Sequence, residues 1–217
     1  KSIALIQGRP MIAWVIEGAL KSKLLHSLIV ATDDARIAKA TESLGVRAIM
    51  TDSNCPSGTD RIWQAIENET CDVLINIQGD EPLVTGELVD LLVQPFLEDR
   101  DLDMATLAHP ISAEELSSDN CVKVVVNQKS EALYFSRFPI PYSREKIDLG
   151  RKQLVTGCLK HIGMYGYRKS FLKRYCQEAP VALELAESLE QLRALYLGAR
   201  IKVVKTETRS WGVDTPE

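Results

Sequence analysis

The chain has 217 residues and a formal net charge of −4, with 26 Lys and Arg against 30 Asp and Glu. This length can bury a substantial core, and the acidic balance argues against the basic surface that duplex nucleic acid requires. The sequence contains no apolar run of about 18 residues, the length that argues for a membrane-spanning helix. Nucleic acid and membrane are therefore not expected as partners.

The cysteines indicate the compartment. Their number is odd, they are widely spaced and none forms a C-x-x-C pair: Cys55, Cys71, Cys121, Cys158 and Cys176. This pattern argues against a disulfide framework and against a zinc site, and it favours thiols in a reducing cytoplasm.

Helix and strand patterns alternate along the first hundred residues. Helices are predicted at 11–25, 35–44, 60–68 and 85–98, and strands at 28–31, 46–50 and 72–78. Strands that are apolar on both faces and alternate with helices predict an α/β fold, with a mostly parallel sheet flanked by helices. Ligands of such sheets bind beyond the carboxyl ends of the strands.

The middle of the chain has a different pattern. Strands are predicted at 104–108, 122–126, 132–136 and 161–167, with loops rather than long helices between them. We interpret residues 110–168 as a mixed-sheet extension of one domain that spans 1–217. A last helix at 183–197 and a last strand at 201–206 complete the expected elements.

Two acidic turns are candidate metal sites. Asp80 follows the strand at 72–78, and Asp214 lies in a second turn near the end of the sequence. Oxygen ligands suit Mg²⁺, which usually keeps phosphate oxygens and waters in its coordination shell. Each turn alone is explained equally well as a solvated loop, whereas the two aspartates together could hold the ion against a nucleotide.

Other polar segments fit a phosphate-bearing or acidic ligand. Residues 57–61 (SGTDR) lead into a helix and offer donors there, although helix capping explains them equally well. Arg137 could clamp a carboxylate through its planar fork, or could form a surface ion pair. His161 and Tyr165 share one strand face that suits a sugar or a subunit interface. The periodicity of the last helix places Glu190 and Arg193 in solvent.

The order and spacing of these segments resemble the 3-deoxy-manno-octulosonate (Kdo) cytidylyltransferase family, whose members are also called CMP-Kdo synthetases. The resemblance covers essentially the whole chain, and ALYFSR with LEQLR separates it from the CMP-sialic acid synthetases. The segments that carry it are GRPMI (8–12), VATDD (30–34), SGTDR (57–61), INIQGDEP (75–82), MATLA (104–108), VKVV (122–125), ALYFSRFPIP (132–141), HIGMYGYR (161–168), LEQLRAL (189–195) and GVDTPE (212–217).

The resemblance implies a cytoplasmic homodimer with a nucleotide-binding α/β fold, whose mixed-sheet extension serves dimerisation. It implies that CTP and Kdo are converted to CMP-Kdo and pyrophosphate for lipopolysaccharide biosynthesis, with Mg²⁺ as cofactor. Asp80 and Asp214 would bind the metal and, with Lys1 and Arg137, act in catalysis. The nucleotide would contact Thr32, Ser57, Gly58, Thr59 and Arg61, and the sugar acid would contact Gln78, Arg137, His161, Tyr165, Glu190 and Gln191.

The chain departs from the family pattern at its two ends. Lys1 corresponds to the final lysine of the family's N-terminal phosphate loop. The first core strand, the rest of that loop and the helix after GVDTPE are absent from this sequence. Two rival functions remain open: a cytidylyltransferase for a related acidic sugar, such as 8-amino-Kdo or sialic acid, and a silent homologue that only binds.

Overall fold

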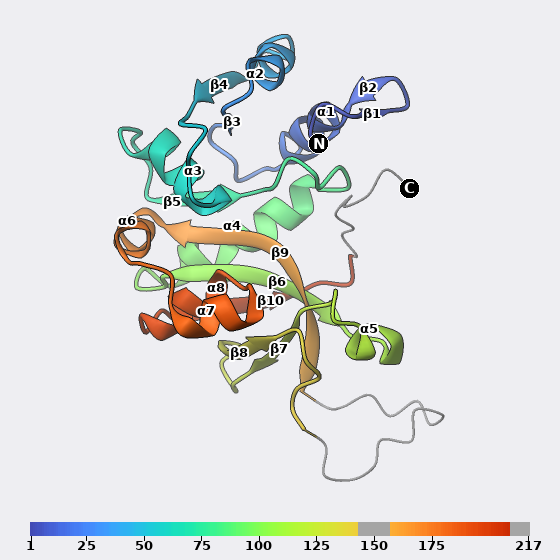
Figure 1. Cartoon of the computed structure of the whole chain (residues 1–217), viewed down its shortest axis with the longest axis vertical. Coiled ribbons are helices and arrows are strands. Elements are labelled where there is room, and N and C mark those ends of the chain that lie inside the picture. Colours follow the sequence, from blue (N-terminus) through green and yellow to red (C-terminus); the bar gives the residue numbers. More distant parts are fainter. Residues whose placement is uncertain (143–156, 209–217) are drawn as a thin grey trace.

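The structure, a computed structural model, describes residues 1–142 and 157–208 (Figure 1). Its helices are α1 (Met11–Ala19), α2 (Ala35–Glu42), α3 (Gly58–Ile66), α4 (Gly86–Glu98), α5 (Ala113–Ser117), α6 (Lys169–Gln177), α7 (Ala182–Glu187) and α8 (Gln191–Tyr196). Its strands are β1 (Leu5–Ile6), β2 (Arg9–Pro10), β3 (Ile29–Thr32), β4 (Arg47–Met50), β5 (Val73–Asn76), β6 (Met104–Pro110), β7 (Lys123–Val126), β8 (Ala132–Ser136), β9 (Cys158–Arg168) and β10 (Ile201–Lys205).

The main sheet is built around the long strand β9. One edge of β9 pairs with β6 along most of its length, and the other edge pairs with β7 near its start and with β5 near its end. These pairings are antiparallel, whereas β10 runs parallel to β6. The α/β class predicted from the sequence is confirmed. The mixed part of the sheet is larger than expected, because β9 also takes in β5 and β6 from the alternating region.

Strands β3 and β4 form a separate parallel pair at the upper end of the molecule (Figure 1). Helix α2 connects them, as the sequence predicts for a parallel crossover. Within 1–142 and 157–208, β3 pairs with β4 and β5 pairs with β9, and no ladder joins β3 to β5. Each of these two strands therefore has one edge without a neighbouring strand.

Both faces of the main sheet are covered, which explains why its strands are apolar on both sides. Helices α1 and α4 pack on one face with Ala105 and Leu107 of β6. Helices α6 and α8 pack on the other face with Met104 and Ala108 of the same strand. Burial of alternate residues on opposite faces gives a helix–sheet–helix arrangement. None of the described helices has the length and hydropathy needed to cross a membrane.

Two helices end earlier than the sequence predicts. Helix α1 stops at Ala19 rather than at residue 25, because the Asp90 carboxylate accepts hydrogen bonds from the main-chain amides of Lys23 and Leu24. The last helix was predicted as one element over 183–197 and is two. Ser188 adopts a left-handed conformation, with φ of 52°, and separates α7 from α8. This break brings residues 189–191 to face the space beside β9.

A buried hydroxyl fixes the orientation of His161 on β9. The pairing of β6 with β9 shifts register after Thr106, and the Thr106 hydroxyl donates to the carbonyl of Met164 at 2.8 Å. The same oxygen lies 2.9 Å from His161 Nε2, so it accepts that proton and fixes the tautomer. Burial lowers the pKa of His161 to about 3, so the ring stays neutral at physiological pH.

This neutral histidine makes stability depend on pH. Its folded pKa lies below the unfolded value, so between these values only the unfolded chain takes up the proton, and stability falls as the pH falls. Between pH 7 and 5.5 we expect the free energy of unfolding to drop by about 1 kcal/mol through this residue. Urea unfolding at both pH values should show that His161→Gln loses this decrease. The exposed His26 is the control: His26→Gln should keep the decrease, and equal pH dependence in wild type and His161→Gln would contradict the assignment.

Candidate functional site

A cavity of about 1000 Å³ lies where β3 and β5 face one another. Its walls come from both strands, from helices α1 and α3, and from the segment 188–191 between α7 and α8. The part between the strands is apolar and includes Val15, Ile29, Ile66 and Ile75. The part beyond the carboxyl ends of the strands is polar, and this is the position at which α/β sheets bind ligands.

The polar part brings together most of the residues predicted from the sequence. These residues come from segments that are far apart in the chain, and they line one space: Thr32, Gly58, Thr59, Arg61, Gln78, Asp80, Tyr165, Glu190 and Gln191. Most of the residues implied for the nucleotide and for the sugar acid therefore share a single cavity, whereas Ser57, Arg137 and His161 do not line it. Asp214 lies outside the described residues.

The turn before α3 is organised by its own side chains. Ser57 is the N-cap, and its hydroxyl accepts from the amide of Asp60 and donates 2.8 Å to the carboxylate of Asp60. The capping explanation of this segment is therefore correct for Ser57. Gly58 begins the helix and has open space around its α-carbon, which leaves room for a ligand at this end of α3.

Arg61 is held in place by residues from two other loops. Its guanidinium donates to the carboxylate of Asp33 at 2.9 Å and to the hydroxyl of Thr51 at 2.7 Å. Thr32, next to Asp33, is buried, and its hydroxyl accepts from the amide of Asp34. The loops after β3 and β4 thus orient one cation at the cavity wall, where an anionic group of a ligand would meet it.

Asp80 lies at the mouth of the cavity beside Lys1. Lys1 Nζ is 3.1 Å from Asp80 Oδ2, and the aspartate side chain retains 20% of its exposure. Gly79 makes this approach possible, because a β-carbon there would lie 2.7 Å from the hydroxyl of Ser2. The expected metal ligand and the expected catalytic lysine are therefore neighbours at the edge of the polar part.

The donor set at this point fits a magnesium ion that is held mainly by phosphates. In the described parts of the chain, no group of three or more His, Cys, Asp or Glu side chains could hold a metal by itself. Asp80 contributes one carboxylate there. Mg²⁺ in nucleotide sites takes one or two protein carboxylates and completes its shell with phosphate oxygens and water, so one exposed carboxylate beside an anion-binding wall is the arrangement expected.

A second wall carries an oriented amide. The Tyr165 hydroxyl donates to Gln191 Oε1 at 3.1 Å, and burial raises the pKa of this tyrosine, so it remains a donor. Gln191 is 3% exposed, and its Nε2 has no hydrogen-bond partner among the described residues. An unpaired buried donor is costly, so this amide is suited to an acceptor on a bound ligand.

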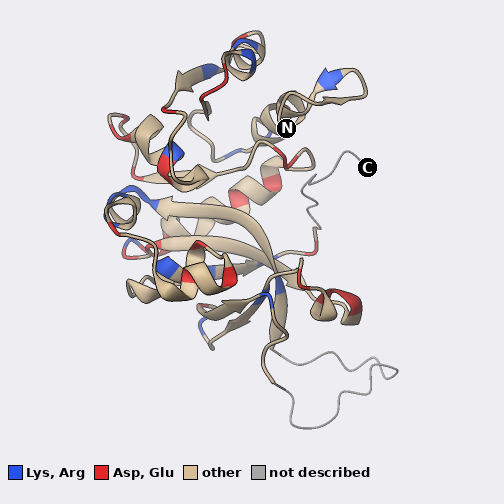
Figure 2. Ribbon diagram, in the orientation of Figure 1, with Lys and Arg blue, Asp and Glu red and all other residues tan. Residues whose placement is uncertain are grey.

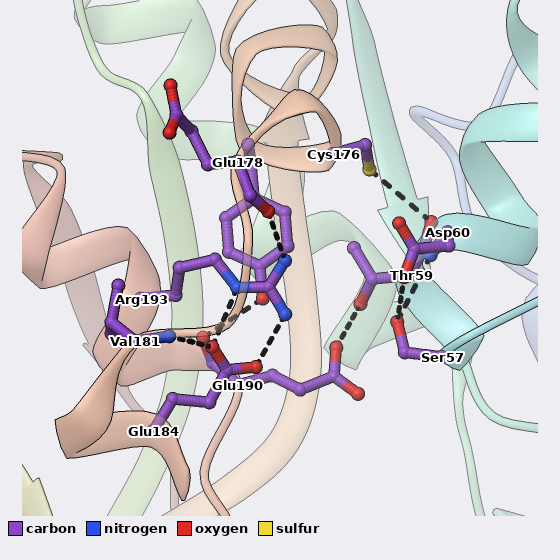
Figure 3. A network of polar contacts seen from close by, with 10 residues as sticks. Ser57, Thr59, Asp60, Cys176, Glu178, Val181, Glu184, Glu190 and Arg193 are labelled. Atoms are coloured by element: carbon purple, nitrogen blue, oxygen red, sulfur yellow. Dashed lines mark hydrogen bonds and ion pairs between the residues drawn. The ribbon is translucent and has the colours of Figure 1, made fainter.

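Thr59 and Glu190 join the two walls. The Thr59 hydroxyl donates to Glu190 Oε2 at 2.7 Å, across 131 positions of sequence (Figure 3). The sequence periodicity placed Glu190 and Arg193 in solvent, and this was wrong. Glu190 is half-buried, and Arg193 is 4% exposed and paired with Glu184. The break at Ser188 turns α8 so that these side chains face inward.

Arg137 and His161 are not among the residues that line the cavity. The Arg137 Nε donates to the carbonyl of Glu187 at 2.9 Å, and its amide donates to the carboxylate of that residue. Its Nη2 reaches the carbonyl of Ser188 at 3.5 Å. The neutral ring of His161 stacks beside Tyr165 with centroids 5.3 Å apart. Nothing in the sequence indicated that Glu187 holds Arg137 or that Thr106 orients His161. Both roles arise from contacts between residues far apart in the chain.

Charges of both signs are distributed over the helices and loops (Figure 2). Helix α6 carries Lys169, Lys173 and Arg174, α7 carries Glu184 and Glu187, and α8 carries Arg193, so successive helices differ in the sign of their charge. Among the described residues, Arg47 and Arg61 line the cavity and Lys1 lies beside Asp80 at its mouth, which is sufficient positive charge for one small anion.

The chain is similar to a known group of enzymes over its whole length. A profile of the cytidylyltransferase family matches residues 1–201. A 3-deoxy-manno-octulosonate cytidylyltransferase of Bdellovibrio bacteriovorus is 60% identical over 217 residues, which is 100% of this chain and 87% of that protein. The enzyme of the same name from Pelobacter propionicus is 45% identical over 222 residues, covering 100% of this chain and 87% of the relative.

Solved structures agree with these relatives. A CMP:2-keto-3-deoxy-manno-octonic acid synthetase complexed with CTP superposes with a TM-score of 0.92 at 42% identity, covering 100% of this chain and 87% of that one. A cytidylyltransferase from Leptospira borgpetersenii has a TM-score of 0.59 at 13% identity and shares the fold alone, over 95% of this chain and 69% of that one. The chain belongs to the 3-deoxy-manno-octulosonate cytidylyltransferase family.

Proposed function

We propose that the chain transfers CMP from CTP to the anomeric hydroxyl of Kdo, releasing pyrophosphate and supplying CMP-Kdo for lipopolysaccharide biosynthesis. The observation that carries this proposal is the single cavity lined both by Gly58 and Arg61 at the start of α3 and by Tyr165 and Gln191 opposite. A transfer between two bound substrates requires such adjacency, because it converts an encounter of two anions into a reaction within one complex.

The reaction is an in-line displacement at the α-phosphorus of CTP. The anomeric oxygen of the sugar forms the new bond to phosphorus, the bond to the bridging oxygen of the β-phosphate breaks, and the hydroxyl proton passes to solvent. Arg61 and Lys1 would offset the negative charge of the nucleotide as it shifts onto pyrophosphate. We assign no side chain as a general base.

Asp80 and Asp214 would hold Mg²⁺ beside the phosphates; the ion, when bound, would supply positive charge that offsets the α-phosphate and would lower the pKa of the attacking hydroxyl. The exposed carboxylate of Asp80 beside Lys1 supports its part in this assignment. Because the Asp80–Lys1 pair lies at the surface, it contributes little to folding, and loss of Asp80 should act on the reaction rather than on stability.

The sugar acid would lie against the wall formed by Gln78, Tyr165 and Gln191. The unpartnered amide of Gln191 supplies a donor for it. We propose that Arg137 binds the sugar carboxylate through its terminal nitrogens, whose contacts to carbonyls, 3.3 Å and 3.5 Å, are longer than the 2.9 Å bond of Nε. His161 would contribute as a neutral ring, since its pKa of about 3 excludes an imidazolium.

We also propose that an extended segment outside residues 1–217 lies between β3 and β5. Each strand has an edge without a partner among the described residues, and the apolar part of the cavity lies between these edges. Their carboxyl ends point to the same polar region, so a parallel strand would satisfy both edges at once. The chain spans 87% of the length of its curated relatives, which leaves room for such a segment.

The homodimer is a further proposal. The extension carries large apolar side chains on its surface: Leu133 on the outer strand β8 is 60% exposed, Phe138 is 72% exposed and Tyr142 is 89% exposed. Exposed apolar groups that gather on one part of a protein mark an interaction surface.

We also place the enzyme in the cytoplasm, because all five cysteines are free thiols. Cell fractionation tests this localisation.

The function is tested by pyrophosphate release. The protein, with the additional segment proposed above, is supplied with CTP, Mg²⁺ and one of Kdo, 8-amino-Kdo or sialic acid. We expect release with Kdo that stops when EDTA removes the metal. Release with 8-amino-Kdo alone would transfer the assignment to a related sugar, and no release with any of the three would overturn the enzymatic function.

Asp80→Asn tests the proposed role of Asp80 in metal binding. It should reduce turnover at least about a hundredfold, as expected when a group that stabilises the transition state is lost, while the urea midpoint stays close to that of wild type. Equal losses of activity and stability would make Asp80 a structural residue.

The additional strand is tested by hydrogen exchange. In residues 1–217 alone, the amides of 29–32 and 73–76 that point away from β4 and β9 should exchange rapidly, since no carbonyl accepts them. In a protein extended by the proposed segment they should be protected like those of β6. Rapid exchange in both proteins would exclude a strand at this position.

The dimer is tested by sedimentation. The chain has a mass of 24.2 kDa, and we expect about twice this mass in solution. Phe138→Asp should shift the protein to the monomer, because a charge in an apolar interface is costly. Leu97→Asp, at a residue of α4 that is 63% exposed, should leave the mass unchanged. A monomeric wild type would contradict the proposal.

A further inference from the structure

Glu190 is held at two points, one on its side chain and one on its main chain. Its carboxylate accepts from the Thr59 hydroxyl at 2.7 Å, and its carbonyl accepts from the Tyr175 hydroxyl at 3.0 Å. The first donor comes from α3 and the second from α6, so two separate elements fix one residue (Figure 3). A half-exposed glutamate normally samples several rotamers, and these bonds restrict it to one.

Tyr175 is itself fixed by a buried ion pair. The guanidinium of Arg193 lies 4.4 Å from the centre of its ring. Arg193 donates to both oxygens of Glu184, at 2.7 Å and 2.5 Å, and to the carbonyl of Glu178 at 3.1 Å. Both charges are buried and mutually compensated, which allows the cation to remain over the aromatic ring. The donor to the Glu190 carbonyl therefore has little freedom to move.

Thr59 directs its hydroxyl proton to Glu190 Oε2. Thr59 is 5% exposed, in the first turn of α3 between Gly58 and Arg61. A hydroxyl has one proton to donate. Thr59 donates this proton to Glu190, which lies next to Gln191 in the sugar wall. Glu190 Oε1 receives no such bond from Thr59, and a carboxylate can only accept.

We propose that Thr59 and Tyr175 are positioning residues for the sugar acid, which orient the Glu190 carboxylate so that it accepts a hydrogen bond from a sugar hydroxyl. The inference rests on the proposed function, because it concerns the second substrate of the same cavity. The Thr59–Glu190 hydrogen bond also connects the nucleotide side of the cavity to the sugar side. The first turn of α3 borders the nucleotide, so the residue that orients Glu190 belongs to the nucleotide wall.

The test removes one hydroxyl at a time. Thr59→Val preserves shape and removes the hydroxyl that donates to Glu190 and also interacts with the Tyr167 side chain. We expect the KM for Kdo at saturating CTP to rise about tenfold, the value of one charge-assisted hydrogen bond, which is a larger factor than any rise in the KM for CTP. Thr59→Ser restores the hydroxyl and should restore the KM for Kdo. Tyr175→Phe keeps the ring beside Arg193 and should raise the KM for Kdo by a smaller factor.

Thr41→Val is the matched control. Thr41 lies in α2, is fully buried and does not line the cavity, and its hydroxyl has no partner among the described residues. This variant should leave both KM values unchanged, and urea unfolding of all variants separates lost stability from lost binding. A rise in the KM for CTP alone, or an unchanged KM for Kdo in a folded and active Thr59→Val, would overturn the inference. Absence of turnover in the wild type would instead overturn the proposed function.

Discussion

The pairing of β9 along both of its edges is the constraint on which the site depends. One edge bonds to β6, and the other bonds to β7 and then to β5. Because Tyr165 lies within the paired region and α6 follows directly after Arg168, the strand fixes both the sugar wall and the helix that carries Tyr175. Movement of β9 would displace both Tyr165 in the sugar wall and Tyr175 on α6. The backbone hydrogen bonds of the sheet therefore fix the wall of the cavity that carries Tyr165.

Polar groups in and next to the cavity walls are oriented by hydrogen bonds from other polar side chains. Thr106 fixes the tautomer of His161, Tyr165 fixes the amide of Gln191, and Thr59 fixes the carboxylate of Glu190. Each bond leaves one defined donor or acceptor for a ligand. Prearranged dipoles of this kind stabilise charge without reorganising during the reaction, which suits a transfer that depends on position and charge more than on proton transfer.

Local patterns predicted most of the fold. Apolar runs and turn residues identified β3 to β10 to within a few residues, because periodicity and Gly or Pro at the boundaries are local properties. They failed where a distant side chain decided the outcome. Asp90 ends α1 early by accepting amides across 67 positions, and contacts between Arg137 and Glu187 accompany the break in the last helix. The short helices α5 and α6 were also missed.

By itself the sequence determined the fold class, the carboxyl-end position of the site and, through the resemblance of its ordered motifs, the family and the residues to examine. Only the tertiary structure decided how these residues relate. It placed Thr59 against Glu190, located Arg193 in a buried ion pair rather than at the expected surface, and left Arg137 and His161 out of the cavity lining. The physical reason is that periodicity records which face of an element is apolar, whereas a hydrogen bond between residues 131 positions apart depends on how whole elements pack.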